Sequence, residues 1–175
     1  MIKAIAILAV LLIGAVLVFA ATRPDTFRVQ RAASIKAPPE RIFPLISDFK
    51  RWAAWSPYEK KDPGMKRSYG GAAEGKGSTY AWEGDGNVGQ GRMEITEAQA
   101  PSRVAIKLDF TRPFEAHNTV LFTMLPKGEL TEVTWDMQGR ASYLSKLIGV
   151  FINMDRMVGK DFEAGLANLK SAAEK

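Results

Sequence analysis

The stretch GKDFEAGLANLK, residues 159–170, places an apolar side chain at every third or fourth position. Phe162, Leu166 and Leu169 therefore share one face of a helix. The same spacing extends back to residue 144, through Leu144, Leu147, Ile148, Phe151, Ile152 and Val158. The pattern predicts one long amphipathic helix from Leu144 to the C-terminus, with Phe151 and Phe162 both buried.

Ahead of this helix, short runs of alternating apolar and polar residues predict a sheet. Glycine and proline pairs such as Gly70-Gly71 and Arg112-Pro113 separate the runs, as turns do. No long helix comes between most of them, so successive runs are expected to pair as antiparallel strands. The predicted strands lie at residues 27–35, 66–69, 78–82, 93–95, 104–110, 120–124 and 133–137.

Two short helices are predicted between the first and second strands. Pro38-Pro39-Glu40 is typical of a helix start, and an apolar face over 42–46 follows. Asp48 is placed to cap the second helix, which runs through Trp52 to Trp55. A twisted sheet of this length curls, and the C-terminal helix can bury its apolar stripe only against the concave side. The fold class is therefore α+β.

The N-terminal segment is apolar throughout. From Ala4 to Ala21 every residue is apolar or glycine, a run of 18 that would form a helix roughly 27 Å long, close to the hydrocarbon thickness of a bilayer. A buried core helix would show a polar face, and this run has none. Two interpretations stay open. The length of the run favours an uncleaved single-pass anchor, whereas Val18-Phe19-Ala20 fits the cleavage site of an exported protein's signal peptide.

We accordingly predict a membrane segment at residues 1–22, a linker at 23–26 and one folded domain at 27–175. Basic residues after the apolar run outnumber those before it, which favours a cytoplasmic domain. That rule weakens when a folded domain follows the segment, so the side of the membrane stays open.

Composition excludes several classes of site. The chain has no cysteine, which excludes disulfides, thiolate metal sites and cysteine nucleophiles, and it has one histidine. The net charge is +5, but acidic and basic residues are interleaved, as in Glu59-Lys60-Lys61-Asp62, and no basic stripe of the kind that binds nucleic acid is present. We expect no metal, no cofactor and no nucleic-acid partner.

Several motifs together resemble the START-like superfamily (SRPBCC), in its polyketide cyclase/dehydrase branch. They are APPERIF at 37–43, WAAWSP at 52–57 with Asp62-Pro63 downstream, the glycine-flanked hairpin at 75–84, and residues 159–170. The resemblance covers residues 27–173. It implies a helix-grip fold, in which a curved antiparallel sheet wraps around a long C-terminal helix and encloses a cavity for hydrophobic ligands. It does not imply cyclase activity.

No catalytic constellation stands out. His117 has polar neighbours and titrates near neutral pH, but we favour its placement on the outer face of a strand, without a catalytic partner. The strand carboxylates lie on the faces opposite the apolar residues, so we expect them to be solvated. These carboxylates are Glu94, Glu97, Asp109 and Asp136.

Aromatic residues give the clearest indication of a binding surface. Nine are predicted to point inward: Trp52, Trp55, Tyr80, Trp82, Phe110, Phe114, Phe122, Trp135 and Phe151. A largely apolar cavity is expected between the helix and the sheet, with Tyr80 and a tryptophan N–H orienting the ligand. The predicted ligand-binding residues are Tyr80, Trp82, Met93, Phe110, Phe122, Trp135, Ile148 and Phe151.

These features favour a membrane-tethered module that binds or transfers a hydrophobic small molecule or lipid, with the membrane contacted through residues 4–21. One alternative is an enzyme acting on a polyketide-like or other hydrophobic substrate, in which a cavity-facing His117 or Tyr80 would supply acid–base catalysis. A second alternative is a protein-interaction domain with a filled core.

Overall fold

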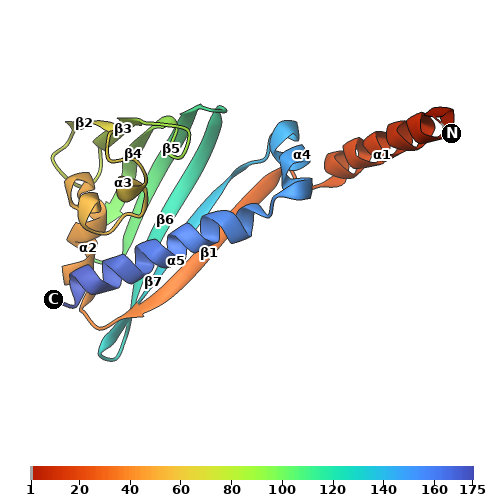
Figure 1. Ribbon diagram of the computed structural model, residues 1–175. Coiled ribbons are helices and arrows are strands. Elements are labelled where there is room, and N and C mark those ends of the chain that lie inside the picture. Colours follow the sequence, from red (N-terminus) through yellow and green to blue (C-terminus); the bar gives the residue numbers. More distant parts are fainter. Residues whose placement is uncertain (1) are drawn as a thin grey trace.

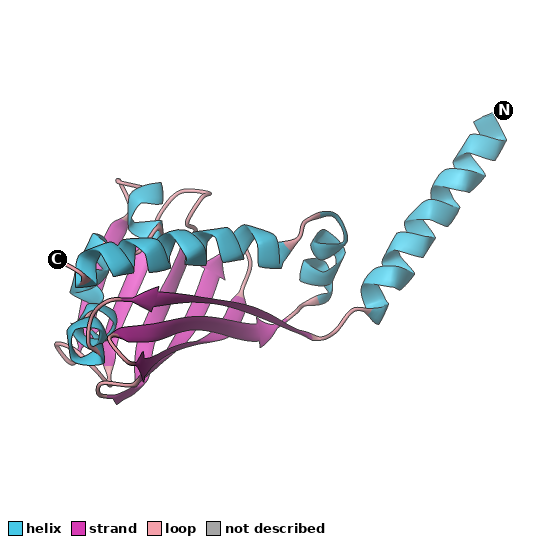
Figure 2. Cartoon of the chain, turned by 90° about the horizontal axis from the view of Figure 1, so that it is seen from below, coloured by secondary structure: helices cyan, strands magenta, loops and turns pink. Residues whose placement is uncertain are grey.

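In the computed structural model, which describes residues 2–175, a curved seven-stranded sheet carries its packed helices on one face (Figure 1 and Figure 2). Every neighbouring pair of strands is antiparallel, in the spatial order β1-β7-β6-β5-β4-β3-β2. This confirms the predicted α+β class and sheet. The strands are β1 (Thr26–Ile35), β2 (Lys66–Gly71), β3 (Ser78–Glu83), β4 (Gln90–Gln99), β5 (Arg103–Arg112), β6 (Ala116–Lys127) and β7 (Leu130–Arg140).

The two short helices between β1 and β2 form as predicted, and a third follows them. They are α2 (Pro39–Ser47), the 3-10 helix η1 (Phe49–Ala54) and α3 (Tyr58–Lys61). Pro39 occupies the first turn of α2, where its missing N–H leaves no intrahelical bond unmade. Asp48 caps η1 by accepting a hydrogen bond from the Lys50 N–H over 2.9 Å. These helices separate β1 from β2 along the chain, and β1 pairs with β7, the last strand.

The C-terminal segment is two helices rather than the single helix that the spacing predicts. They are α4 (Tyr143–Phe151) and α5 (Met154–Ala173), and the backbone of Ile152 and Asn153 between them is extended. The Asn153 side chain caps α5 by accepting a hydrogen bond from the Arg156 N–H over 2.9 Å. Apolar spacing continues across this break, because a cap interrupts the helical backbone without changing the order of apolar residues.

Helix α5 lies directly on the sheet. Its residues Phe162, Leu166 and Leu169 are buried. A Cβ at Gly165 would come within 2.7 Å of the Trp135 ring and 3.0 Å of Pro57, so the glycine permits this close approach. Phe162 is 1% exposed, as predicted, whereas Phe151 at the end of α4 is 75% exposed, so the prediction that it is buried is wrong.

Helix α1 (Ile2–Thr22) projects away from the sheet (Figure 1). Ala20 is its buried residue, and its large apolar side chains are exposed. The helix is long and apolar enough to cross a membrane, a test that a signal sequence also meets.

Candidate hydrophobic ligand site

Six of the eight predicted ligand-binding residues lie together on the concave face of the sheet. Tyr80 stands directly opposite Met93 across β3 and β4, and Phe122 stands opposite Trp135 across β6 and β7. The Trp82 ring lies 5.5 Å from the Phe110 ring and 6.0 Å from that of Tyr80. We call this set the inner aromatic surface: Tyr80, Trp82, Met93, Phe110, Phe122 and Trp135.

The other two predicted residues do not join the inner aromatic surface. Ile148 and Phe151 belong to α4, which packs chiefly against α1. Our placement of them over the sheet depended on one continuous helix, and the break at Asn153 turns α4 away. Phe114 is exposed in the turn after β5, so its predicted inward placement is also wrong.

Aromatic side chains from the short helices pack against the inner aromatic surface. The Trp55 ring lies 5.5 Å from that of Trp135 and 5.9 Å from that of Phe122. Phe49 lies 5.8 Å from Tyr80 and 5.2 Å from Trp52. The inward placement of the two helical tryptophans is confirmed. The inward placement of Phe49 could not be predicted from the sequence, because Phe49 follows a helix cap, where no periodicity marks the inner side.

The four indole N–H groups differ in their hydrogen bonding. Those of Trp52, Trp55 and Trp82 donate to the backbone carbonyls of Ile46, Leu45 and Val88 over 2.8–3.0 Å. The Nε1 of Trp135 is buried and has no partner within residues 2–175.

Asn118 lies on the same face of β6 as Phe122. Its Oδ1 is also buried and has no partner within residues 2–175. A buried polar atom without a partner costs roughly 1–3 kcal/mol, so native proteins rarely retain one without a reason. These two atoms are the polar positions on which a ligand could be oriented.

The hydroxyl of Tyr80 is already engaged. It donates to Glu59 Oε1 over 2.7 Å, and Arg67 Nε donates to Glu59 Oε2 over 2.6 Å. Burial, followed by this bond to a carboxylate, raises the pKa of Tyr80. No sequence pattern marks Glu59 or Arg67, because Glu59 lies in a four-residue helix and Arg67 on the edge strand β2.

His117 lies on the outer face of the sheet, as predicted, with its side chain 67% exposed. Its Nδ1 lies 2.7 Å from Asp109 Oδ1, and its Nε2 lies 3.3 Å from a Glu115 carboxylate oxygen. The hydrogen bond with Asp109 raises the pKa of His117, and the charge of Glu115 acts in the same direction. The partner could have been found from the register, since Asp109 stands opposite His117.

Among the strand carboxylates, Asp136 departs furthest from the expected solvation, since the side chain of Asp109 is still 24% exposed. Asp136 is buried and forms an ion pair with Arg28 of the adjacent strand β1. Alternation along β7 assigns Asp136 to the outer face but does not reveal the arginine that covers it. Within residues 2–175, no group of three His, Cys, Asp or Glu residues is arranged to hold a metal ion.

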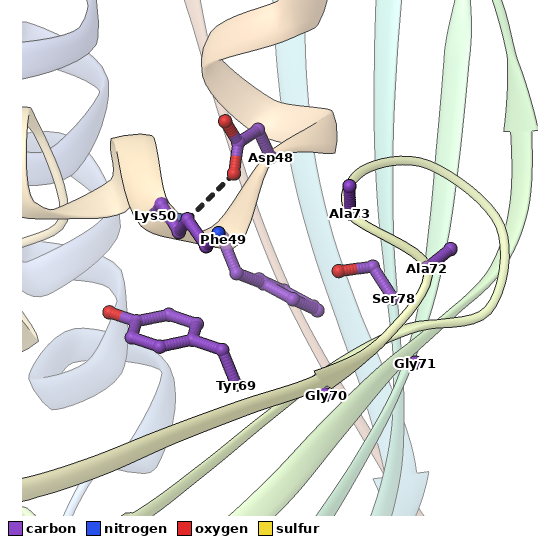
Figure 3. Close-up of a pocket in the computed structure, with 9 residues that line it drawn as sticks. All are labelled: Asp48, Phe49, Lys50, Tyr69, Gly70, Gly71, Ala72, Ala73 and Ser78. Atoms are coloured by element: carbon purple, nitrogen blue, oxygen red, sulfur yellow. Dashed lines mark hydrogen bonds between the residues drawn. The ribbon is translucent and has the colours of Figure 1, made fainter.

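Two hollows flank the hairpin that joins β2 and β3, and neither lies between α5 and the sheet, where the sequence predicts a cavity. One, of about 150 Å³, is lined by Asp48, Phe49, Lys50, Tyr69, Gly70, Gly71, Ala72, Ala73 and Ser78 (Figure 3). The other, of about 340 Å³, is lined by Phe43, Pro44, Ser47, Glu74, Gly75, Lys76, Ala98 and Ala100. Behind the first hollow, Tyr80 of the inner aromatic surface lies 5.8 Å from Phe49 and 5.2 Å from Tyr69, measured between ring centroids.

A curved antiparallel sheet that holds a C-terminal helix against its concave face defines the helix-grip class of START-like (SRPBCC) proteins. The sequence profile of the family described as "Polyketide cyclase / dehydrase and lipid transport" matches residues 26–174. This chain therefore belongs to that family.

Solved structures share the fold at low sequence identity. CV1439 from Chromobacterium violaceum is 16% identical, with a TM-score of 0.59, and the match covers 87% of this chain and 99% of that one. TTHA0849 from Thermus thermophilus is 18% identical, with a TM-score of 0.58 and coverage of 84% and 97%. Major latex-like protein 151 from Panax ginseng is 15% identical, with a TM-score of 0.58 and coverage of 85% and 97%. No curated protein matches the sequence.

Proposed function

We propose that this chain binds an apolar small molecule or lipid on its inner aromatic surface, and that α1 tethers the binding domain to a membrane. The observation that carries the proposal is the Nε1 of Trp135, a buried donor in a largely apolar wall, without a partner within residues 2–175. An acceptor atom of a ligand would satisfy it. The family description, which includes lipid transport, supports the same class of ligand.

The two unpartnered polar atoms suggest the form of the ligand. Trp135 stands opposite Phe122, and Asn118 lies four residues away from Phe122 along β6, or about 13 Å at the usual rise of a strand. Burial of apolar surface supplies the affinity at about 25 cal/mol per Å², and a few polar contacts supply the orientation. An elongated apolar molecule with an acceptor near one end and a donor near the other fits both atoms.

Access to the inner aromatic surface requires a local opening, because most of its side chains are buried. The hollow in Figure 3 offers the shortest approach, since Phe49 and Tyr69 on its wall contact Tyr80. The hairpin beside it is held by backbone hydrogen bonds, from Gly75 N–H to Ser47 O and from Gly77 N–H to Ile95 O, each 2.8 Å long. Release of this hairpin would open the edge of the sheet beneath η1.

The positions of the two acid–base candidates favour binding over the enzyme alternative. The raised pKa of Tyr80 keeps its phenol neutral at physiological pH, and its proton is directed to Glu59. His117 lies on the opposite side of the sheet from the inner aromatic surface. Neither residue is therefore set to exchange a proton with a ligand on that surface.

Photolabelling of the full chain in lipid nanodiscs with a diazirine-bearing fatty acid tests this proposal. We expect labelled peptides from β3 and β7, and we expect an excess of unlabelled fatty acid to suppress this labelling. Label confined to α1 and α4, which lipid reaches in any case if α1 spans the bilayer, would contradict binding and favour the alternative of an interaction domain with a filled core.

A further inference from the structure

An exposed apolar surface lies on α4 and the start of α5, separate from the inner aromatic surface. We call it the α4 surface; its members are Tyr143, Leu144, Phe151, Ile152, Met154 and Met157. Each is at least 39% exposed. Soluble surfaces rarely gather so many large apolar side chains unless they contact a partner or a membrane.

Three contacts hold the α4 surface beside the end of α1. Tyr143 Oη donates to the Leu17 carbonyl over 3.1 Å, and the Arg23 guanidinium donates to the Gly149 carbonyl. Lys146 forms an ion pair with Asp25. The segment after α1 is therefore bound to the domain at several points, which fixes how α4 lies relative to α1 (Figure 2).

We propose that the α4 surface docks in the headgroup region of the same bilayer that α1 crosses. The inference rests on the proposed tether. The apolar run of α1 ends at Ala21, between Leu17 and Arg23, and both of these residues bind α4. The α4 helix is therefore held at the depth where α1 leaves the hydrocarbon.

Side-chain chemistry also favours a lipid surface over a second protein. Apolar side chains on such a helix enter roughly 5–10 Å into the headgroup and acyl boundary, and tyrosine is enriched at that depth. Residues 140–160 carry four basic side chains, of which Lys146 is paired with Asp25, and one acidic side chain, Asp155, which is paired with Arg31. This surplus of positive charge complements anionic headgroups.

A fluorescent label at position 151 measures the docking directly. The chain has no cysteine, so Phe151→Cys provides a single attachment site for an environment-sensitive fluorophore. Leu125→Cys on β6, also an exposed apolar position, is the matched control. The full chain is placed in vesicles of phosphatidylcholine and phosphatidylglycerol. We expect spin-labelled lipid to reduce the emission at position 151 about twofold or more, the response of a group at the headgroup boundary, and to leave position 125 unchanged.

The other outcomes separate the two proposals. If the chain floats with vesicles but aqueous iodide alone quenches position 151, docking is wrong and the tether stands. If position 151 in detergent becomes less accessible to iodide as the protein concentration rises, a second copy of the chain covers the α4 surface and docking is again wrong. If the chain does not float, the tether and docking both fail, while photolabelling of β3 and β7 still decides ligand binding.

Discussion

The indole ring of Trp135 in β7 lies flat against the phenyl ring of Phe162 in α5, with ring centroids 4.0 Å apart and ring planes 8° apart. This contact joins the C-terminal helix to the inner aromatic surface. It places α5 over the tryptophan whose N–H has no partner in the part of the chain that the structure describes. The same pair of residues therefore serves the stability of the fold and the proposed ligand site.

Loss of the Phe162 ring should destabilise the fold strongly. Phe162→Ala removes a buried ring and leaves a cavity against Trp135, which we expect to cost about 3–5 kcal/mol of unfolding free energy. Phe151→Ala is the matched control from the exposed end of α4 and should change this free energy by no more than about 0.5 kcal/mol. Denaturant unfolding of the full chain in detergent measures both. Equal losses at the two positions would contradict the division into α4 and α5.

Removal of the Trp135 N–H should affect ligand binding more than stability. Trp135→Phe deletes a donor that has no partner within residues 2–175, so we expect only the cost of a smaller buried ring, about 1–2 kcal/mol of stability, and a ligand affinity about tenfold weaker. Trp55→Phe makes the same change of ring and also leaves the Leu45 carbonyl without its donor, so it should cost about 1–3 kcal/mol more. Denaturant unfolding and competition against the photolabel distinguish the two variants. Unchanged affinity in Trp135→Phe would remove the indole from the proposed site.

The sequence predicts the sheet well because alternation depends only on which face of a strand is buried. Val133, Trp135 and Met137 alternate with polar residues and do line the core. The break at Asn153 could not be predicted from spacing, since the apolar positions on both sides keep a helical interval. Because of that one cap, Ile148 and Phe151 lie on α4, away from the sheet, and do not form part of the predicted cavity wall.

Polar partners proved harder to predict than apolar faces. The bond between Glu59 and Tyr80 joins α3 to β3, and the pair of Arg28 and Asp136 joins β1 to β7. Neither pair is close in sequence, so only the tertiary arrangement brings its members together. Asp109 and His117 are the exception, because a short hairpin sets their register.

Tyr80 should make stability depend on pH in the alkaline range. Burial and the bond to Glu59 raise its pKa above the unfolded value of about 10. A group whose folded pKa is raised contributes stability that is fully present below the unfolded pKa and is lost as pH rises above it. We expect unfolding free energy to fall from about pH 10 upward, and Tyr80→Phe to reduce that slope. Burial raises the pKa of Tyr58 as well, so Tyr58→Phe should remove a separate part of the pH dependence of the unfolding free energy. An unchanged slope in both variants would contradict the assignment.

His117 should titrate above its ordinary pKa of about 6.5, chiefly because of its hydrogen bond with Asp109. Protonated His117 stabilises the fold below its ordinary pKa, and this stabilisation is lost as pH rises through the raised pKa. The effect is small because the side chain is exposed. NMR titration of this single imidazole measures the pKa, and Asp109→Asn should lower it. His117→Ala should leave ligand affinity unchanged. A marked loss of affinity would revive the enzyme alternative.

Native mass spectrometry of the full chain, released from detergent micelles, tests most directly whether this protein carries a hydrophobic ligand. We predict a mass adduct of one small apolar molecule per chain, retained at collision energies that strip detergent and reduced in Trp135→Phe but not in Phe151→Ala. A chain that shows only its own mass, and that still gains no adduct after incubation with long-chain fatty acids, would contradict the account.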